Sequence, residues 1–396
     1  MQRNKSKINK SSARSIRLHH ILMHEPKFAH RIFDIFNNPA IENQYWVTVF
    51  DKKINNIPQT KSILFQDIND KNKIQSIAKS FGESDMFIFH YFTHDHITLY
   101  KFVSQKTCTI LQLWGGDYST HYISPINLYS KPTYAACILP QSKLKKIPNL
   151  LARLYHHLKW VMNSKSRSYR LVLTSAFHVG FELGGVEQQM FNIRTQAQNS
   201  LHIPYSIDLT QYPKELNHQS SRNDILLGNS ATATNNHIEV ISWIAQHKTN
   251  FDVCNIPLSY GDTNTQLSVA KHATEKLKNQ ANILKKFMPK IDYFAILEST
   301  EYVIMNHCRQ QGLGNILWGL ATGRTIYLNQ RGPIFKACMD HGLHIKSSAS
   351  LKHTPPSPIT IQEKNQNRLK IDSLYPSNVT LRSDLLELIE KWKNRA

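Results

Sequence analysis

The sequence predicts an α/β protein built as two halves, each with a parallel sheet. Segments typical of strands alternate with segments typical of helices along most of the 396 residues, a pattern that favours parallel α/β architecture. A polar stretch at 211–224 interrupts this alternation, and a second alternating set follows it. Polar motifs containing glycine stand where predicted strands end, and ligands of such sheets bind at the carboxyl ends of strands. We therefore expect two α/β domains separated by a cleft.

The first half starts with an apolar strand at 16–24 and a helix at 28–38, whose apolar residues recur at helical spacing. The remaining strands of this half are predicted at 45–50, 62–66, 85–91, 108–114 and 170–175, and the remaining helices at 74–81, 96–104, 146–162 and 180–197.

In the second half, Gly323 stands where glycine commonly ends a helix. Strands are predicted at 224–230, 251–260, 302–307 and 325–329, and helices at 235–247, 266–288, 293–299 and 310–322. A weakly patterned basic segment, 341–375, leads to a last amphipathic helix at 381–395.

The expected domain organisation has four parts. They are a basic flexible tail at 1–15, an N-terminal domain at 16–215, a C-terminal domain at 216–375 and a C-terminal helix within 376–396. The basic residues of the tail suit either a solvated chain end or attraction to anionic lipid.

The charge balance is strongly basic, with 48 Lys and Arg against 28 Asp and Glu, a formal net charge of +20. Such a surface attracts nucleic acid, anionic lipid or phosphorylated substrates. A specific nucleic-acid-binding protein would show basic residues interleaved with aromatic residues on one face, or a known binding module. The sequence contains neither, so no specific nucleic-acid partner is expected.

The five cysteines are scattered and form no C-x-x-C pair, which disfavours a disulfide framework and a thiolate zinc site. The sequence contains no apolar run of ~18–20 residues and begins with a polar, basic segment instead of the apolar core of a signal peptide. We expect a cytoplasmic protein that can be held at a membrane surface.

The motif GNSATATNNHIE at 228–239 follows a predicted strand and opens a helix, which we expect Thr234 or Asn235 to cap. Free N–H groups near Asn229 and Ser230 at such a point attract an anion, typically phosphate. An ordinary capped turn is the alternative.

The motif NHCRQQGLGN at 306–315 also joins a strand to a helix. Arg309 can neutralise a diphosphate there, and Gln310 and Gln311 can bind hydroxyl groups or a base edge. Gly312 lets a ligand or another segment of backbone approach closely. The alternative is tight packing of helix on sheet.

Two further motifs end strands. In QLWGGDYS (112–119), Gly115 and Gly116 would present an exposed Asp117 as a general base or sugar ligand, and Trp114 could pack on a sugar face. In IPLSYGD (256–262), Tyr260 could stack on a base or bind a phosphate. Simple turns are the alternative in both cases.

Histidines are numerous, and His90, His94 and His96 stand close together in the sequence. No carboxylate or cysteine set completes a metal site around them, so neither a metal nor another cofactor is expected. His90 and His24 each end a predicted strand and, with Glu25, are alternatives to Asp117 as the base.

Taken together, WGGD at 114–117, GNSATATNNHIE at 228–239, PLSYGD at 257–262 and RQQGLGN at 309–315 resemble one family. It is the TDP-N-acetylfucosamine:lipid II N-acetylfucosaminyltransferases, also called 4-alpha-L-fucosyltransferases (glycosyltransferase family 56). The resemblance extends from about residue 16 to about residue 333.

The resemblance implies a GT-B fold, with two Rossmann-like α/β domains facing across a cleft. The C-terminal domain would bind a nucleotide-sugar, expected to be a dTDP-linked deoxyaminosugar, and the N-terminal domain a polyprenyl-diphosphate-linked saccharide. Such enzymes work at the cytoplasmic face of the bacterial inner membrane as peripheral proteins, which agrees with the charge. A UDP- or GDP-sugar donor, a non-catalytic scaffold and a basic protein that binds nucleic acid or membrane are the alternatives.

The implied reaction displaces a nucleoside diphosphate from an anomeric carbon, and we assign candidate residues to it by their chemistry. Asp117 or His90 would be catalytic. The donor side would comprise Gly228, Asn229, Ser230, Tyr260, Arg309, Gln310, Gln311, Gly312 and Asn315, and the acceptor side Trp114, Gly115, Gly116, His24 and Glu25.

Overall fold

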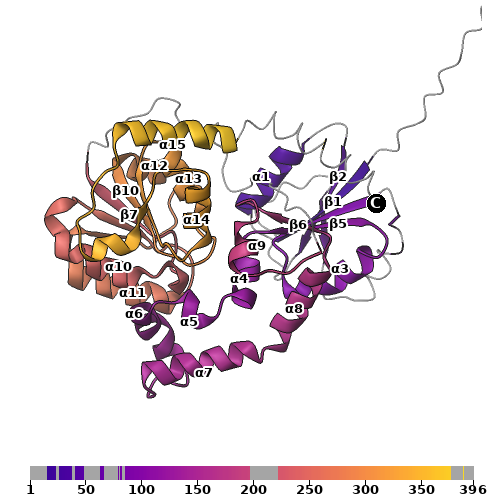
Figure 1. Cartoon of the computed structure of the whole chain (residues 1–396), viewed down its shortest axis with the longest axis horizontal. Coiled ribbons are helices and arrows are strands. Elements are labelled where there is room, and N and C mark those ends of the chain that lie inside the picture. The colour runs from indigo at the N-terminus through magenta and orange to yellow at the C-terminus, as the bar shows by residue number, and fades with distance from the viewer. Residues whose placement is uncertain are drawn as a thin grey trace, which may run out of the picture. The chain divides into compact units, whose positions relative to one another are not determined.

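The computed structural model describes residues 16–23, 26–37, 41–48, 63–66, 79, 81–82, 85–196, 222–375 and 387. The chain divides into two compact units (Figure 1). The first unit comprises residues 1–90, 95–111 and 381–396, and the second comprises residues 91–94 and 112–380.

The first sheet has six strands in the order β3-β2-β1-β4-β5-β6. The strands are β1 (Ile16–Met23), β2 (Ile41–Thr48), β3 (Ile63–Gln66), β4 (Asp85–His90), β5 (Cys108–Leu113) and β6 (His178–Phe181). The central strand β1 runs parallel to both β2 and β4, and every residue of β4 is buried, as is typical of a parallel strand covered on both faces. Helices α1 (Pro26–Phe36) and α3 (Ile97–Val103) lie where helices are predicted.

The second sheet also has six strands, in the order β12-β11-β10-β7-β8-β9. The strands are β7 (Asp224–Leu227), β8 (Cys254–Pro257), β9 (Ala281–Leu284), β10 (Thr300–Met305), β11 (Thr325–Leu328) and β12 (Lys346–Ser347). Each neighbouring pair is parallel. Both halves are therefore parallel α/β structures, which confirms the predicted fold class.

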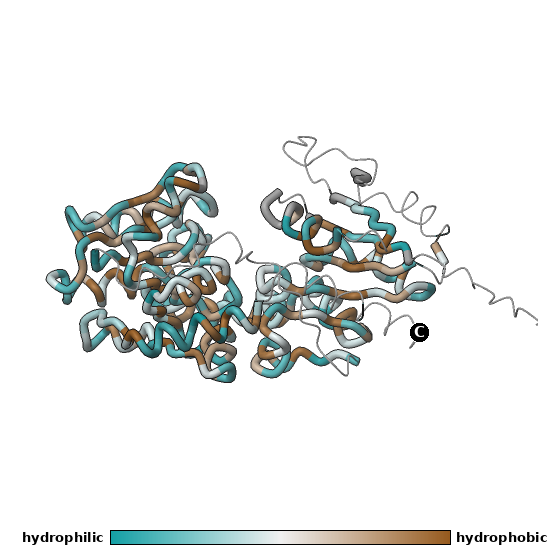
Figure 2. Tube along the Cα trace, turned by 90° about the horizontal axis from the view of Figure 1, so that it is seen from above, coloured by the Kyte–Doolittle hydropathy of each residue, from teal (hydrophilic) through white to brown (hydrophobic). Residues whose placement is uncertain are grey.

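The core of the second unit lies on both faces of this sheet, because successive strand residues point to opposite sides. Ile225 and Leu227 pack in one cluster with α10 (His237–Ile244) and α11 (Thr263–Leu277), whereas Leu226 packs in the other. The helices that contribute to the second cluster are α9 (Val186–Met190), α12 (Lys290–Ser299), α13 (Leu313–Ala321), α14 (Pro333–Asp340) and α15 (Ile361–Leu374) (Figure 1). Apolar stretches, brown in Figure 2, run through the interior of the unit.

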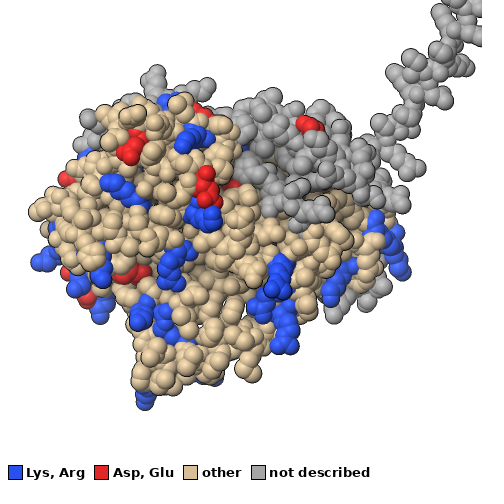
Figure 3. All heavy atoms as spheres, viewed as in Figure 1, with Lys and Arg blue, Asp and Glu red and all other residues tan. Residues whose placement is uncertain are grey.

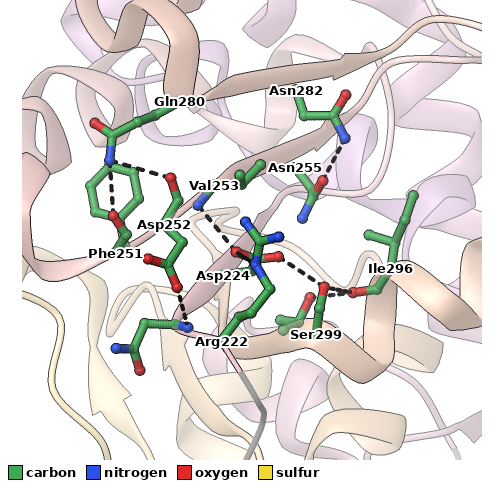
Figure 4. A network of polar contacts seen from close by, with 12 residues as sticks. Arg222, Asp224, Phe251, Asp252, Val253, Asn255, Gln280, Asn282, Ile296 and Ser299 are labelled. Atoms are coloured by element: carbon green, nitrogen blue, oxygen red, sulfur yellow. Dashed lines mark hydrogen bonds and ion pairs between the residues drawn. The ribbon is translucent and has the colours of Figure 1, made fainter.

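The amino ends of these strands are joined by polar contacts (Figure 4). Asp224 accepts hydrogen bonds from the backbone N–H of Val253 (3.1 Å) and the hydroxyl of Ser299 (2.8 Å), and it pairs with Arg222. Asn282 donates to Asn255 on the next strand at 2.7 Å. This network satisfies polar groups at the edge opposite the carboxyl ends and therefore stabilises the sheet.

Between β5 and β6 of the first sheet the chain forms α4 (Gly116–Tyr122), α5 (Pro125–Leu128), α6 (Lys131–Thr133), α7 (Asn149–Val161) and α8 (Ser164–Ser175). The predicted strand at 170–175 is wrong, because these residues belong to α8. Asn163 caps this helix by accepting a hydrogen bond from the N–H of Lys165. Tyr169 and Leu173 are buried one turn apart, so helical burial outweighs the strand-like composition.

Three other predicted elements have different bounds. The long helix predicted at 266–288 ends at Leu277, where Lys278 adopts a positive φ of 55°, and β9 follows. The helix predicted at 180–197 is reduced to α9, and the weakly patterned segment 341–375 contains α15, which starts with a capping box between Thr360 and Glu363.

The prediction that Gly323 ends a helix is confirmed. This glycine has φ 73° just after α13, and the N–H of Arg324 donates to the carbonyl of Gly319 at 2.7 Å. The two features form a Schellman motif.

Several expectations lie outside the described residues: the tail at 1–15, most of the helix at 74–81, most of the boundary at 211–224 and the helix at 381–395, of which only residue 387 is described. The four-part domain organisation therefore stays a prediction. Among the described residues, no helix has the length and apolar character needed to cross a bilayer.

Candidate active site

The four predicted motifs come together in the second unit. Three of them follow the carboxyl ends of β7, β8 and β10, and the fourth follows β5. Contacts between these loops join segments that are up to about 200 residues apart in the sequence, and each contact is described below.

The loop after β7 is held by the buried side chain of Asn235. Its amide donates to the carbonyl of Ser230 at 3.0 Å and to the hydroxyl of Thr232 at 3.0 Å, and its oxygen accepts from the N–H of Asn229. Gly228 has φ 69°, and a Cβ there would lie 2.3 Å from His237 Nε2, so the position requires glycine.

The predicted helix cap in this loop is wrong. Helix α10 begins at His237, and its N-cap is Asn236, which has a left-handed backbone (φ 53°). The side chains of Thr234 and Asn235 bind the loop and Gln311 instead of the helix N–H groups.

Gln311 joins the loop after β10 to the loop after β7. Its amide nitrogen donates to Asn229 Oδ1 at 3.0 Å and to Thr232 Oγ1 at 2.8 Å, and its oxygen accepts from Thr234 Oγ1 at 2.6 Å. Gly312 lies directly beside Asn229, because a Cβ added at Gly312 would lie 3.3 Å from the Cβ of Asn229. The predicted donor residues of these two motifs are therefore brought together.

Tyr260 belongs to the same group. The Asn229 amide donates to the Tyr260 hydroxyl at 3.0 Å, and the N–H of Ala231 donates to the Tyr260 carbonyl at 2.7 Å. The ring is exposed, as stacking on a ligand requires. Gly261 (φ 122°) abuts the backbone of Ala231, which fixes the two loops against each other.

The loop after β5 contacts the loop after β10 through glycine. Gly115 has φ 90°, and a Cβ there would lie 2.5 Å from the carbonyl oxygen of Gln310. A Cβ on Gly116 would lie 2.7 Å from the hydroxyl of Tyr91. Trp114 is buried and packs edge-to-face with Tyr91, with ring centroids 5.9 Å apart.

Asp117 is buried, with 5 % of its surface exposed, so the expectation of an exposed carboxylate is wrong. The carboxylate accepts hydrogen bonds from the N–H groups of Trp114 (3.1 Å) and Tyr118 (3.0 Å). Burial nevertheless raises the pKa of Asp117 to about 7, because desolvation penalises the charged form more than these bonds favour it.

Arg309 supplies positive charge near this carboxylate. Its side chain is partly buried and donates to the carbonyl of Gln310 at 3.2 Å. Burial lowers its pKa from the ordinary value, and the neighbouring Tyr91, Tyr118 and Asp117 act in the opposite direction. A guanidinium in such surroundings keeps its charge and can bind a diphosphate through several donors.

Asn315 lies in the first turn of α13, half-buried, and its N–H donates to the carbonyl of Gly312.

Two further buried acids of the second unit, Glu182 and Glu187, were missed by the sequence analysis. Glu182 accepts a hydrogen bond from Gln310 at 3.5 Å, and Glu187 is fully buried at the start of α9. Burial and the nearby charge of Glu182 raise the pKa of Glu187 to about 8. Gly184 and Gly185 lie between these two acids, and both have a positive φ. This pair of glycines next to an acid resembles the WGGD motif, and it is the sequence signal that could have pointed to Glu182 and Glu187.

His90 lies in the first unit, whereas the motif loops lie in the second. It is buried at the end of β4, with its Nε2 3.1 Å from Nδ1 of His20, and it packs edge-to-face on Phe36. Burial holds the pKa of His90 well below its usual value. His24 and Glu25 lie outside the described residues. No group of three His, Cys, Asp or Glu able to hold a metal ion occurs within the described part of the chain.

Solved structures show similarity to nearly the whole chain. Sucrose-phosphate synthase from Thermosynechococcus elongatus has a TM-score of 0.64 and 8 % identity, covering 96 % of this chain and all of the other. A glycosyltransferase from Rickettsia africae has a TM-score of 0.58 and 11 % identity, covering 97 % of this chain and all of the other. Anabaena HepE in complex with UDP-glucose has a TM-score of 0.59 and 10 % identity, covering 95 % and 100 %. At this identity the likeness concerns the fold, which is of the GT-B type.

No curated protein matches the sequence. The family described as 4-alpha-L-fucosyltransferase, glycosyl transferase group 56, matches residues 169–354. These residues include three of the four motifs, those at 228–239, 257–262 and 309–315. The match and the GT-B fold together identify a glycosyltransferase, and the match over residues 169–354 confirms the resemblance to the 4-alpha-L-fucosyltransferases that the motifs predict.

Proposed function

We propose that this glycosyltransferase moves an N-acetylfucosamine-like deoxyaminosugar from a dTDP-sugar to a polyprenyl-diphosphate-linked saccharide, in the synthesis of bacterial surface polysaccharide. The observation that carries the proposal is the convergence of four motif loops beside Arg309. The match of residues 169–354 to the 4-alpha-L-fucosyltransferase family supports the sugar class.

In this proposal the donor lies against the loops after β7, β8 and β10. Arg309 and the N–H groups near Ser230 stabilise the departing diphosphate, which gains negative charge as the anomeric bond breaks. Tyr260 contacts the nucleoside or sugar with its exposed ring. Gln311 acts through the loop, because its three hydrogen bonds hold Asn229 and Thr232 in place.

Asp117 is the proposed general base. A carboxylate with a pKa of about 7 accepts a proton from the attacking hydroxyl more readily than an ordinary aspartate does, and it is still partly ionised at neutral pH. The N–H groups of Trp114 and Tyr118 orient it. Glu187, with its raised pKa, is the alternative within the same group of acids.

The proposed location is the cytoplasmic face of the bacterial inner membrane, where the protein is held peripherally. The net charge of +20 supports this proposal, because anionic lipid attracts basic surfaces and the acceptor is itself a lipid diphosphate.

A second donor class is a UDP-sugar. It is supported by the structurally similar Anabaena HepE, which was solved in complex with UDP-glucose.

Thermal unfolding of the purified chain with dTDP, UDP, GDP or ADP at equal concentration tests the donor. A nucleotide at about 100 times its Kd stabilises the folded state by about 2.7 kcal/mol. We expect a selective rise with dTDP that is lost in Arg309→Ala. The matched control is Arg368→Ala on α15, whose side chain pairs with Asp372 and which should respond like the wild type.

A selective rise with UDP would keep the glycosyltransferase and change the donor. No response to any of the four nucleotides would contradict the proposed donor site.

A further inference from the structure

Helix α7 turns its apolar side outward. Leu150 and Met162 are 73 % and 77 % exposed, and the residues between them on the same side are about half exposed. The exposed apolar residues are Ile147, Leu150, Leu151, Leu154, Tyr155, Leu158, Val161 and Met162. Their spacing of three and four residues places them in one stripe along the helix, which we call the α7 stripe.

The opposite side of α7 is polar and is bound to the protein. Arg153 donates to the carbonyls of Tyr129 (3.1 Å) and Ile126 (2.7 Å), and His157 lies 2.7 Å from the hydroxyl of Ser124. The indole of Trp160 donates to the carbonyl of Thr120 at 2.7 Å. Turning the stripe inward would break these bonds, so its exposure is built into the fold.

The chain around α7 carries charge of one sign. From 118 to 181 the sequence has nine Lys and Arg residues and no Asp or Glu. An open pocket of about 390 Å³ lies between α7 and the segment before it, and its lining includes Lys143, His156 and Lys159. Lysines and arginines, blue in Figure 3, border the region where Figure 1 places α7.

We propose that the α7 stripe docks on a bilayer that contains anionic lipid. An apolar stripe flanked by lysines is the arrangement of a helix that lies in the plane of a membrane interface. The apolar residues enter the acyl boundary while the lysines reach the phosphate groups of the lipids. The absence of acidic residues over 64 positions matches this partner, since an acid there would be repelled by the same surface.

This inference deepens the proposed peripheral location and rests on it for the identity of the membrane. It would bring an enzyme whose acceptor is a lipid diphosphate to the surface where that lipid resides.

Cosedimentation of the full chain with vesicles tests the proposal, with no nucleotide present. Vesicles of phosphatidylcholine with phosphatidylglycerol are compared with vesicles of phosphatidylcholine alone. The test variant is Leu154→Glu with Leu158→Glu, and the matched control is Leu267→Glu with Leu369→Glu on α11 and α15, whose side chains are at least as exposed. Both variants add two negative charges.

We expect the wild type to prefer the anionic vesicles, the test variant to lose at least tenfold in partitioning and the control to stay within about twofold of the wild type. A second variant, Lys143→Ala with Lys145→Ala and Lys146→Ala, should weaken binding and reduce its salt dependence, and it keeps the test valid if the first variant unfolds.

Equal binding of wild type and test variant would overturn the proposal, as would failure of the wild type to bind either vesicle. Light scattering without lipid tests whether a second copy of the chain covers the stripe instead. If the wild type were a dimer, the test variant a monomer and vesicle binding the same for both, the stripe would be assigned to a second copy of the chain. Sugar transfer to a short-chain, water-soluble acceptor should be retained by the test variant, so loss of docking and failure of the proposed reaction give different results.

Discussion

At the scale of single residues, burial sets the chemistry of two neighbouring acids, Asp117 and Glu187. Asp117 and Glu187 lie in the same unit and are both desolvated, so that their pKa values rise to about 7 and about 8. Raised values of this kind are common where a protein transfers protons at neutral pH. The two acids differ in their partners, because Asp117 accepts two backbone N–H bonds, whereas the side-chain partner of Glu187 is Tyr118, which offsets only part of its desolvation.

The substitution Asp117→Asn tests whether Asp117 acts in catalysis or only supports its loop. The amide oxygen of asparagine can still accept from the N–H groups of Trp114 and Tyr118, but it cannot take a proton. If Asp117 is the base, we expect kcat to fall at least about 100-fold with little change in melting temperature, and the rise of wild-type activity through pH 7 to disappear. Steady-state kinetics from pH 5.5 to 9 measure both effects. Wild-type-like turnover in the folded variant would leave Asp117 with a structural role only.

Glu187→Gln should increase stability at alkaline pH. The folded chain holds the Glu187 proton more tightly than the unfolded chain, whose pKa is near 4.5. The favourable contribution is therefore complete below pH 4.5 and is lost as pH rises toward about 8. The variant has no charge to bury, so its melting temperature relative to the wild type should rise between pH 5 and 9, by roughly 2 °C or more at the upper end. A difference that is constant with pH would contradict the buried, protonated state of Glu187.

At the scale of elements, one buried carboxylate joins three segments of the second unit. Glu239 on α10 accepts hydrogen bonds from the hydroxyls of Ser130 (2.7 Å) and Thr133 (2.8 Å) and from the amide of Asn306 (2.9 Å). The segment around α6, the start of α10 and the end of β10 are thus held together. This arrangement places the loop after β10, which contains Arg309, against its neighbours.

Glu239→Ala should destabilise the protein through these three donors. Leaving buried donors without an acceptor costs about 1–3 kcal/mol each, and we expect the free energy of unfolding to fall by about 3 kcal/mol or more in urea. Glu239→Gln keeps an acceptor and should cost less. Glu275→Ala is the control, because its ion pair with Lys271 is exposed and such pairs contribute ~0–1 kcal/mol. If Glu239→Ala and Glu275→Ala lowered the free energy of unfolding equally, Glu239 would not hold the three segments together.

At the scale of the whole molecule, charge and the α7 stripe act on the same step of the proposed function, the encounter with a membrane-bound acceptor. The net charge is +20, and attraction between exposed charges weakens as the Debye length falls from about 10 Å at 0.1 M salt to about 3 Å at 1 M. The proposed catalysis in the loops beside Arg309 involves partly buried groups, which salt screens much less.

A high salt concentration should therefore slow the encounter with the membrane but leave the transfer reaction itself nearly unchanged. We expect transfer to an acceptor embedded in anionic vesicles to slow several-fold between 0.1 and 1 M NaCl, with the loss in kcat/KM, while transfer to a soluble short-chain acceptor changes little. Initial rates with both acceptors at fixed donor concentration measure this difference. A parallel loss with both acceptors would place the effect of salt on the donor site instead of on the membrane.

Local patterns in the sequence determined most of the elements and identified the loops that form the candidate site. Strands such as β4 and β10 are continuous apolar runs, and Gly323 marks the end of α13, because these signals depend only on neighbouring residues. The motifs at the ends of β7 and β10 could be read as one site because parallel strands bring their carboxyl ends to the same edge. The family was also readable from these motifs.

Tertiary structure decided what depends on distant segments. The burial of Asp117 follows from packing around α4, and the contact of Gly115 with Gln310 joins positions 195 residues apart. The strand-like run at 170–175 becomes part of α8 because its helical side is the one that is buried. The sequence does not predict the raised pKa of Glu187, because the nearby Gly184–Gly185 pair does not show that this carboxylate is desolvated.

Helix α7 shows most clearly what the sequence determines and what the tertiary structure decides. Its spacing of apolar residues predicts a helix, and the usual inference would place that side in the core. Instead, Arg153 and His157 bind groups contributed by residues 124–129, and they hold the polar side inward. Periodicity is a property of the chain by itself, whereas the side that faces the interior is set by the partners that folding brings to the helix.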